Sequence, residues 1–536
     1  MAETVGALII AGLSSAGATG VAGFSLASTT IAGVGLSSIV GGAAILGATI
    51  GLQAAFGAKQ NLPSNEQGSQ PLQQAVPPRL RGYGRCRVSG YYMLFEATSG
   101  DSYDIIAWHH GRATALVALY LHDDQVFLNS NYPSDDRIST LINDGRYADI
   151  VRIRYHLGGP IGPTHFFFSV TGMDSLFATN THLGRDVAWL SLVCGKTASA
   201  EDFTKAYPRN LPVPSVVADL SPVWDPRDPT QFRATASTWK ISYNPIIQLI
   251  DYLTREDGGL GLDYSIIIEP VLDQWIEEAN ICDALELRAD GSFEARYWCH
   301  GWFTFDNKPE DVINAILATC DGWLCESGDG TLAIKAGYYR APTVTLTDAH
   351  ILSFSASYGQ ADEQAVNELN ITFTDPSQKY AKVQTETLRN EEAIAQSGVV
   401  RSQPLDLSWV QSNSQARRLA ARAMQRLNPQ MTGTLVTTLY GLRALGERWV
   451  AVKYPYVSGL QDCVVEIQDA SIDLMSGRIT FNYRRVDTGK IEAYNPESDE
   501  GSTPTTPPAG GINPILREDG SPLYREDGIP FIREAA

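Results

Sequence analysis

The first sixty residues contain a long stretch without any charge, and this constrains the chain more than any other feature. From Val5 to Ala58 there is no charged side chain, and Glu3 and Lys59 bracket the stretch. A soluble domain of this length exposes charged residues to water. Residues 1–59, here called the arm, therefore require lipid, a protein partner, or a lumen that copies of the same arm close.

Small residues recur at every fourth position in two parts of the arm. They are Gly12, Ala16 and Gly20, and then Ala43, Gly47, Gly51 and Ala55. This spacing places small side chains on one face of a helix, where another backbone can approach closely. We therefore predict an apolar helical arm that bundles with the arms of other subunits.

Three other interpretations of the arm remain open. A secretory signal needs a basic first segment, whereas the only early charge is that of Glu3. Two membrane helices fit the length, because about 20 apolar residues span a bilayer. However, twelve glycines between Gly6 and Gly57 weaken a helix. The third alternative is a flexible Gly/Ala segment.

The charge and the cysteines of the whole chain exclude some functions. A net charge of −19 argues against a general nucleic-acid binder, which needs a basic surface to replace counterions. An acidic wall would still let DNA slide past without sticking. Seven irregularly spaced cysteines indicate reduced thiols rather than a disulfide framework, which fits assembly in a cytoplasm.

A chain of 536 residues is too long for one core, and its patterning divides it into segments. We expect a mainly β protein with an α+β insertion. The predicted order is the arm (1–59), a polar linker (60–78), a β-rich domain (79–236), a small α/β domain (237–340), a second β-rich region with one helix (341–488), and a low-complexity tail (489–536).

Strand patterns dominate the first β-rich domain. The segments at 91–98 and 165–170 are rich in aromatic and β-branched residues, and residues 213–229 indicate a strand that leads into a proline-punctuated loop. Residues 151–157 alternate strictly, with Val151 and Ile153 on one face and Arg154 and His156 on the other. This alternation predicts a half-buried strand whose polar side chains face water.

Helix signals mark the α/β domain and one later segment. We predict helices from about Pro245, over residues 271–285, and from Pro309, because proline is favoured in a first turn. Strands are predicted at 295–303 and 330–337, and later at 369–376, with a hairpin of 462–474 and 477–486. A helix from Ser414 carries four arginines opposite its apolar face, and we expect these arginines to face solvent.

The tail ends in a repeat with a period of eight residues, in which Arg-Glu-Asp-Gly occurs at Arg517 and again at Arg525. Asp-Gly favours tight turns with positive φ. Each unit therefore predicts a short strand and turn, and three tails could interleave into a small β-prism. A disordered end is the alternative.

Candidate catalytic and metal-binding residues are few. His109–His110 with Asp123–Asp124 match no known ligand spacing, and we expect an exposed polar loop there. Cys299–His300 with Cys320 and Cys325 suit zinc in type but lack the CxxC spacing, so we expect buried free thiols. Glu277–Glu278 and Asp135–Asp136 fit solvated surfaces. We expect no metal, no cofactor and no enzymatic activity.

Two motifs carry a resemblance to a known family. LIDYLTREDGGLGL (Leu249 to Leu262) followed by EANICD (Glu278 to Asp283) resembles a paired signature in the tail-tip hub proteins of long-tailed bacteriophages, the group of the lambda host-specificity protein. Further stretches from 81 to 427 match in the same order. The signature positions are Asp251, Tyr252, Leu253, Gly261, Glu278, Ala279, Asn280, Ile281, Cys282 and Asp283.

The resemblance implies a structural virion protein at the distal end of a phage tail. Such hubs are similar to baseplate hubs: they form homotrimers whose tube-type β-barrel domains cap the tail tube, braced by an α/β insertion. Expected partners are the distal tail protein, the tape-measure protein, other tail-tip proteins and tail fibres. The arm would lie in the lumen and could contact the host membrane through residues 5–58, and DNA would only pass through.

This chain is much shorter than the lambda protein, so we expect receptor recognition to pass to separate fibres rather than to extensions of this chain. Two rival functions stay open on the sequence alone. One is a membrane-active secreted or surface protein with inserting N-terminal helices. The other is an enzyme such as a cell-wall hydrolase fused to a hub.

Overall fold

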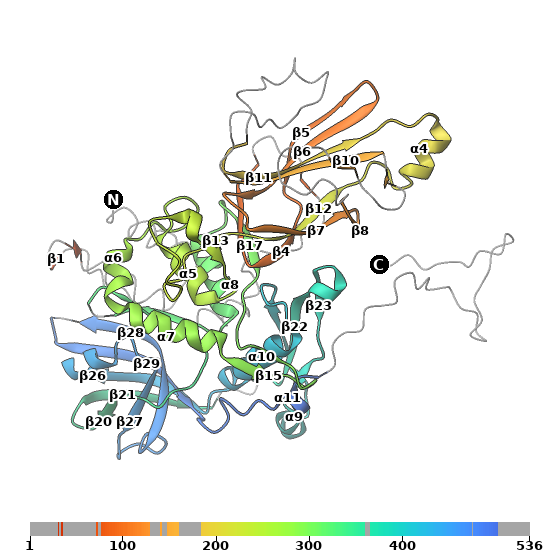
Figure 1. The fold of residues 1–536 in the computed structure, drawn as a ribbon. Helices are drawn as coiled ribbons and strands as arrows, with labels where there is room; N and C mark the ends of the chain where they lie inside the picture. The colour runs from red at the N-terminus through yellow and green to blue at the C-terminus, as the bar shows by residue number, and fades with distance from the viewer. Residues whose placement is uncertain are drawn as a thin grey trace, which may run out of the picture.

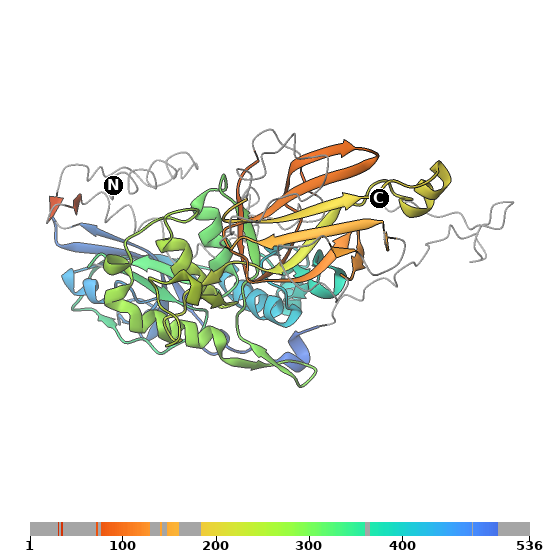
Figure 2. The same cartoon turned by 45° about the horizontal axis from the view of Figure 1, so that its top comes forward.

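The structure is a computed structural model, and it describes most of the chain beyond residue 76. The described residues are 30–31, 34–35, 71–72, 77–128, 140–141, 147–148, 150–159, 184–327, 329–359, 365–473 and 475–501. The protein is mainly β, as predicted, with a group of helices in the middle. Figures 1 and 2 show a five-stranded sheet at one end, a curled six-stranded sheet at the other, and the helices between them.

The first β part has two sheets that enclose one core. The five-stranded sheet has the order β5-β6-β11-β10-β9, and the four-stranded sheet has the order β4-β12-β7-β8. Trp108, Leu121 and Leu190 lie in the core that both sheets share. The strands are β4 (Arg85–Val88), β5 (Tyr91–Thr98), β6 (Asp101–His110), β7 (Ala115–Leu121), β8 (Asp124–Val126), β9 (Thr140–Leu141), β10 (Val151–Leu157), β11 (Val187–Cys194) and β12 (Pro214–Asp219).

The strands predicted at 91–98, at 151–157 and at the start of 213–229 are confirmed as β5, β10 and β12, but the prediction that the polar face of β10 is exposed is wrong. Arg154 and His156 are 7% and 3% exposed. The His156 ring stacks on Trp189 of β11 with the ring centroids 5.8 Å apart, and the Arg154 guanidinium lies 5.9 Å from the same indole. Alternation in a sequence cannot reveal that a tryptophan from the neighbouring strand covers the polar face.

Short elements lie between β11 and β12 and between β12 and the central helices. α4 (Ala200–Ala206) begins at its N-cap Ser199, whose side chain accepts a hydrogen bond from the Asp202 amide. The other connecting elements are β13 (Pro222–Val223), the 3-10 helix η3 (Ala236–Thr238) and β14 (Lys240–Ile241), and β13 pairs with β14.

Three helices of the central part, α5, α7 and α8, begin within one residue of the predicted starts. The Asn244 side chain caps α5 and leaves Pro245 in its first turn. The elements are α5 (Pro245–Thr254), α6 (Tyr264–Ile267), the 3-10 helix η4 (Glu269–Val271), α7 (Leu272–Asp283) and α8 (Pro309–Ala318), with strands β15 (Leu285–Leu287), β16 (Phe293–Ala295), β17 (Gly301–Thr304), β18 (Trp323–Glu326) and β19 (Leu332–Lys335).

The single strand predicted at 295–303 is instead divided. β16 ends at Ala295, and β17 begins at Gly301 and pairs with β3 (Leu80–Tyr83). Between them, the Cys299 amide donates to Tyr243 O and the His300 amide donates to Trp409 O. Backbone partners outside any sheet therefore interrupt the strand. The strand predicted at 330–337 is confirmed as β19.

One hydrophobic core joins these helices to a later sheet and to α10 (Asn413–Leu427). Leu249 of α5, Ile316 of α8, Phe373 of β22 and Leu419 of α10 all belong to it. The sheet consists of β22 (Glu368–Asp375), β23 (Ala381–Gln384), β24 (Leu388–Arg389) and β25 (Ser402–Leu407), with the 3-10 helix η6 (Pro376–Gln378) and α9 (Glu391–Ser397) alongside.

The six-stranded sheet curls around its own core and has the order β20-β27-β28-β29-β26-β21. Val450, Ile479 and Phe481 fill that core. The predicted hairpin is confirmed as β28 (Cys463–Asp473) and β29 (Arg478–Val486). The remaining elements are β20 (Thr345–Thr347), β21 (Ile351–Tyr358), β26 (Met431–Thr437), the 3-10 helix η7 (Leu439–Ala444), β27 (Trp449–Lys453) and α11 (Pro496–Asp499).

Several predictions fall outside the described residues. These include both small-residue stripes of the arm, the strand at 165–170, Asp135–Asp136 and the Arg-Glu-Asp-Gly repeat. Within the arm, the described residues are β1 (Thr30–Ile31) and β2 (Val34–Gly35), which pair with each other. None of the described helices has the length and apolar character needed to cross a membrane.

Candidate functional site

The first half of the signature lies at the end of α5 and anchors that helix to the first β part. Asp251 is buried and accepts a hydrogen bond of 2.9 Å from the Tyr83 hydroxyl and one of 2.6 Å from Arg255. Arg81 lies 3.5 Å away and is also buried. Burial opposes ionisation, but Arg255 and Arg81 hold the Asp251 pKa below its ordinary value.

The next signature residues shape the loop after α5. Tyr252 and Leu253 are buried, and their carbonyl groups accept hydrogen bonds from the amides of Leu260 and Leu262. Gly261 has a φ of +63°, a conformation that favours glycine. The loop therefore folds back onto the end of the helix.

The second half of the signature lies on α7, and its glutamate is not solvated as we expected. Glu278 is fully buried and pairs with Arg340, while its Oε2 accepts a hydrogen bond of 2.9 Å from the Ala336 amide. Glu277 is exposed and lies 3.0 Å from the same arginine. In the sequence, two adjacent acidic residues on a helix look like part of an exposed surface. Their partner Arg340 lies 62 positions away along the chain, so the sequence does not reveal the ion pair.

The other α7 signature residues link this helix to its surroundings. The Ala279 carbonyl accepts a hydrogen bond of 2.8 Å from the Asn244 side chain, and Ile281 packs against the central core. Asn280 and Asp283 both bind Arg227, at 3.0 and 2.8 Å. The signature thus braces α5 and α7 against the core and the loop around Arg227.

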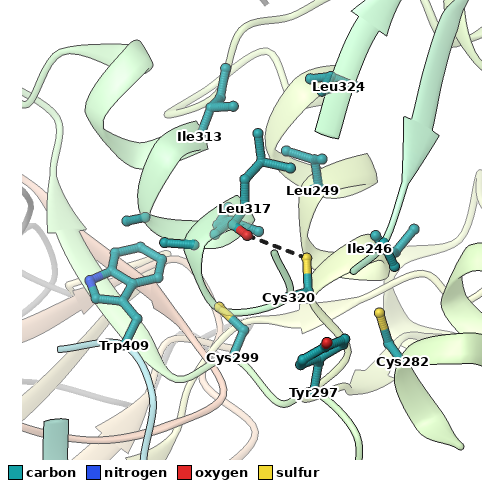
Figure 3. Close-up of a cluster of buried hydrophobic side chains, with 14 of the residues drawn as sticks. Ile246, Leu249, Cys282, Tyr297, Cys299, Ile313, Leu317, Cys320, Leu324 and Trp409 are labelled. Carbon is teal, nitrogen blue, oxygen red and sulfur yellow. Dashed lines mark hydrogen bonds between the residues drawn. The ribbon is translucent and has the colours of Figure 1, made fainter. Parts of the chain in front are cut away.

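The cysteines of the central part are buried thiols, as predicted. Figure 3 shows Cys282, Cys299 and Cys320 near Tyr297 and Trp409, and the Cys320 thiol donates to the Leu317 carbonyl at 3.6 Å. Burial raises the pKa of the Cys282 and Cys299 thiols well above the ordinary value. A protonated thiol is a poor nucleophile and a poor metal ligand, so these side chains act as core residues.

The exposed loop predicted around His109–His110 is wrong, because both histidines lie in β6. His109 is 2% exposed, and its Nε2 lies 3.1 Å from the Ser221 hydroxyl. Burial and the nearby Arg81 lower the pKa of His109 to about 3. His110 Nε2 lies 2.7 Å from an Asp257 carboxylate oxygen.

The two aspartates of the same candidate cluster bind arginines instead of histidines. Asp123 accepts a hydrogen bond of 3.0 Å from Arg87, and Asp124 accepts one of 2.6 Å from Arg209. Among the residues that the structure describes, no group of three or more His, Cys, Asp or Glu side chains could hold a metal ion.

A buried ionic network, not predicted from the sequence, joins the central part to the six-stranded sheet. Asp321, just after α8, binds Arg422 at 2.9 Å, Arg448 at 3.1 Å, and Arg426. Glu466 of β28 binds Arg448 and Arg484, each at 2.8 Å, and Arg426 at 3.3 Å. The six side chains are between 1% and 11% exposed.

The prediction that the arginines of α10 face solvent is therefore wrong. Arg417, Arg418 and Arg422 are between 5% and 7% exposed, and Arg426 reaches both buried carboxylates. The periodicity correctly separates an apolar face from a basic face. It cannot show that Glu466 and Asp321, which lie far from the helix in the sequence, cover the basic face.

The network is held in its charged form. Burial alone would raise the pKa of the Asp321 and Glu466 carboxyl groups, yet the surrounding arginines hold both far below their ordinary values. Removing one partner from such a network leaves an uncompensated buried charge. These residues therefore fix the relative position of α8, α10 and the curled sheet.

Comparison with known proteins gives a family match for one part of the chain. A family described as "Putative phage tail protein" matches residues 308–431, the segment from the start of α8 to the start of β26. It includes Asp321 and all four arginines of α10. No curated protein sequence matches the chain.

Three solved structures are similar to this chain. A chain from the virion of a native gene transfer agent particle has 12% identity and a TM-score of 0.50, and the match covers 83% of this chain and 93% of that one. A prophage MuSo2 tail protein from Shewanella oneidensis has 11% identity, coverages of 76% and 98%, and a TM-score of 0.27. A tail protein from Neisseria meningitidis MC58 has 10% identity, coverages of 79% and 98%, and a TM-score of 0.27.

The first of these likenesses extends over most of the chain and supports a shared fold, while the family match is confined to 124 residues, 308 to 431. Together they relate residues 308–431 to a family described as phage tail proteins and most of the chain to a fold found in a virion. In this chain, the signature and the ionic network hold segments of the protein together.

Proposed function

We propose that this protein is the hub of a phage tail tip, a homotrimer that closes the distal end of the tail tube. In this role it takes part in host attachment and DNA ejection. The observation that carries the proposal is the fold likeness to a chain of a gene transfer agent virion, which extends over 83% of this chain. The match of residues 308–431 to a phage tail family supports the same role.

The segments divide this work in the proposal. Residues 79–236 and 341–488 supply the β-rich units of the tube end, and residues 237–340 brace them. The buried network around Asp321 and Glu466 suits this role, because a closed tube end must keep its parts in register. The partners are the distal tail protein, the tape-measure protein, other tail-tip proteins and tail fibres, in a particle assembled in the host cytoplasm.

The arm is proposed to lie along the threefold axis. Three uncharged arms can bundle through the stripes at Gly12, Ala16 and Gly20 and from Ala43 to Ala55. During ejection residues 5–58 would enter the host membrane. DNA is only passing cargo, and we expect an acidic lumen, because acidic walls repel phosphate.

Electron microscopy of purified tails tests the hub proposal directly. We expect three copies of this chain in a threefold cone on the end of a sixfold tube. A monomer along the tail shaft, or a sixfold ring of this chain, would contradict the proposal.

The arm can be tested with matched substitutions of alanine by leucine. Ala43→Leu with Ala55→Leu places bulk on the stripe, whereas Ala44→Leu with Ala48→Leu places the same bulk on a neighbouring face. We expect the first pair to lower infectivity by about a hundredfold or more, since close backbone contact is lost, and the second pair to have little effect.

Deleting residues 2–58 should leave trimers intact and abolish infective tails. Normal infectivity of that deletion would refute the assigned role.

A further inference from the structure

The β15–β16 hairpin exposes an apolar face without any cover from the described residues. Leu285, Leu287 and Phe293 are 70%, 45% and 64% exposed. Leu287 pairs directly with Phe293, and Leu285 with Ala295, so the four side chains share one face. A two-stranded hairpin is marginally stable by itself, and an exposed apolar face indicates a missing partner.

The opposite face of the hairpin is polar and tied to the protein. Glu294 accepts hydrogen bonds of 2.9 Å from Arg418 and 2.7 Å from Ser412, and Glu286 lies 2.5 Å from Arg296. Figure 1 shows β15 beside α10 and α11. These contacts fix the orientation of the hairpin and leave its apolar face directed outward.

The turn of this hairpin has a sequence that the tail repeats. In Leu287-Arg-Ala-Asp-Gly-Ser-Phe293, the Gly291 amide donates to Arg288 O at 3.0 Å, and the Arg288 amide donates to Ser292 O at 2.9 Å. Gly291 has a φ of +80°, and the Asp290 carboxylate accepts a hydrogen bond from the Ser292 amide. This is a three-residue loop closed by a glycine bulge.

The tail carries the Arg-x-Asp-Gly sequence of this turn twice, between apolar residues. The two units are Leu516-Arg-Glu-Asp-Gly-Ser-Pro-Leu523 and Tyr524-Arg-Glu-Asp-Gly-Ile-Pro-Phe531. Each unit has one added proline, and the serine of the hairpin turn is kept in the first unit and replaced by isoleucine in the second. Each unit therefore has what a similar turn needs, with apolar residues on both sides.

The chain enters the tail directly beside the hairpin turn. The Glu500 carboxylate accepts a hydrogen bond of 2.7 Å from the Ala289 amide. Asn413 and Arg417 hold the carbonyl groups of Glu500 and Asp499 at 3.1 and 2.7 Å. From this anchored point, the residues up to Ile515 span at most roughly 50 Å, so the apolar face is within reach.

We propose that residues 515–532 of the tail dock on the apolar face of the β15–β16 hairpin. The Arg-x-Asp-Gly units form turns like the one at Arg288–Ser292, and Leu516, Leu523 and Phe531 cover the apolar face. The tail then completes a small sheet of which the body supplies the first two strands. This arrangement does not depend on the proposed position at the tail tip.

Hydrogen exchange of the full chain tests the docking. We expect Leu516→Ser, Leu523→Ser and Phe531→Ser together to speed amide exchange of residues 285–295 about tenfold. This is the effect of releasing a segment whose effective concentration is about ten times its dissociation constant. Conversely, Leu287→Ser with Phe293→Ser should speed tryptic cleavage after Arg517 and Arg525. Met475→Ser, which alters an exposed apolar residue in another turn, is the control and should change neither measurement.

Two outcomes would overturn the docking. One is unchanged exchange of residues 285–295 in the tail variant. The other is a change in oligomeric state on mutating the hairpin but not the tail, which would assign the apolar face to a second copy of the chain.

Discussion

Replacing Asp321 by asparagine is expected to lower the free energy of unfolding by about 3–5 kcal/mol, the usual effect of removing one partner of a buried ion pair. Three arginines contact this carboxylate: without it, Arg426 and Arg448 would be left with Glu466, and Arg422 with the partly exposed Glu492. Asparagine has nearly the same shape, so the change isolates the charge. Chemical denaturation followed by tryptophan fluorescence measures the difference.

Asp462→Asn is the matched control, because Asp462 is exposed just before β28 in the same part of the protein. Adding Arg422→Leu to Asp321→Asn should recover part of the lost stability, since it removes one of the buried cations that Asp321 balanced. If Asp321→Asn costs no more than Asp462→Asn, the network does not hold the two parts together.

Acid is expected to destabilise the protein through two buried histidines, His109 and His300. Burial is the main cause that lowers the pKa of each to about 3, with Arg81 acting on His109 and Arg85 on His300. Below pH 6.5 the unfolded chain gains a proton at each site, while the folded chain stays neutral until about pH 3. Their contribution to stability is therefore full above pH 6.5 and falls by roughly 2–3 kcal/mol for each histidine at pH 4.5.

One buried and one partly buried carboxyl group act in the opposite direction. Burial raises the pKa of Asp104 to about 6 and that of Glu326 to about 7. These groups favour the folded state at low pH and lose that contribution as the pH rises through 6 to 7. The effect of the histidines is therefore measured as the difference in free energy of unfolding between the protein and a variant that lacks both histidines but keeps both carboxyl groups.

The variant carries His109→Gln and His300→Gln. At pH 7.5 it should be less stable by about 1–2 kcal/mol, because hydrogen bonds such as the one to Ser221 are lost. At pH 4.5 it should be the more stable protein. His350→Gln, at a partly exposed ring, controls for the change of residue type. If the difference in free energy of unfolding between the protein and this variant stays the same from pH 7.5 to pH 4.5, the two histidines do not cause the acid destabilisation.

Local structure was predictable wherever neighbouring residues determine it. Pro245 and Pro309 mark the first turns of α5 and α8, and the Met475–Ser476–Gly477 turn joins β28 to β29. The strand at 295–303 failed because its backbone partners, Tyr243 and Trp409, lie more than 50 positions away. Sequence patterns carry information over a few residues, and these contacts are not local.

The signature was found from the sequence, but its physical role was not. Asp251 and Glu278 were recognised by resemblance alone, and only the structure shows that each is a buried anion held by arginines. Glu278 looked like half of an exposed acidic pair, because Arg340 is far along the chain.

By itself, the sequence determined the uncharged arm, the mainly β class and the starts of α5, α7, α8 and α10, because these depend on composition and short-range periodicity. Only the tertiary structure decided where the charges of α10 go. Arg422 and Arg426 lie on a basic helix face that any sequence analysis would assign to water, yet Asp321 and Glu466 cover it. Burial of a charge depends on partners brought together by folding, and helix periodicity contains no information about them.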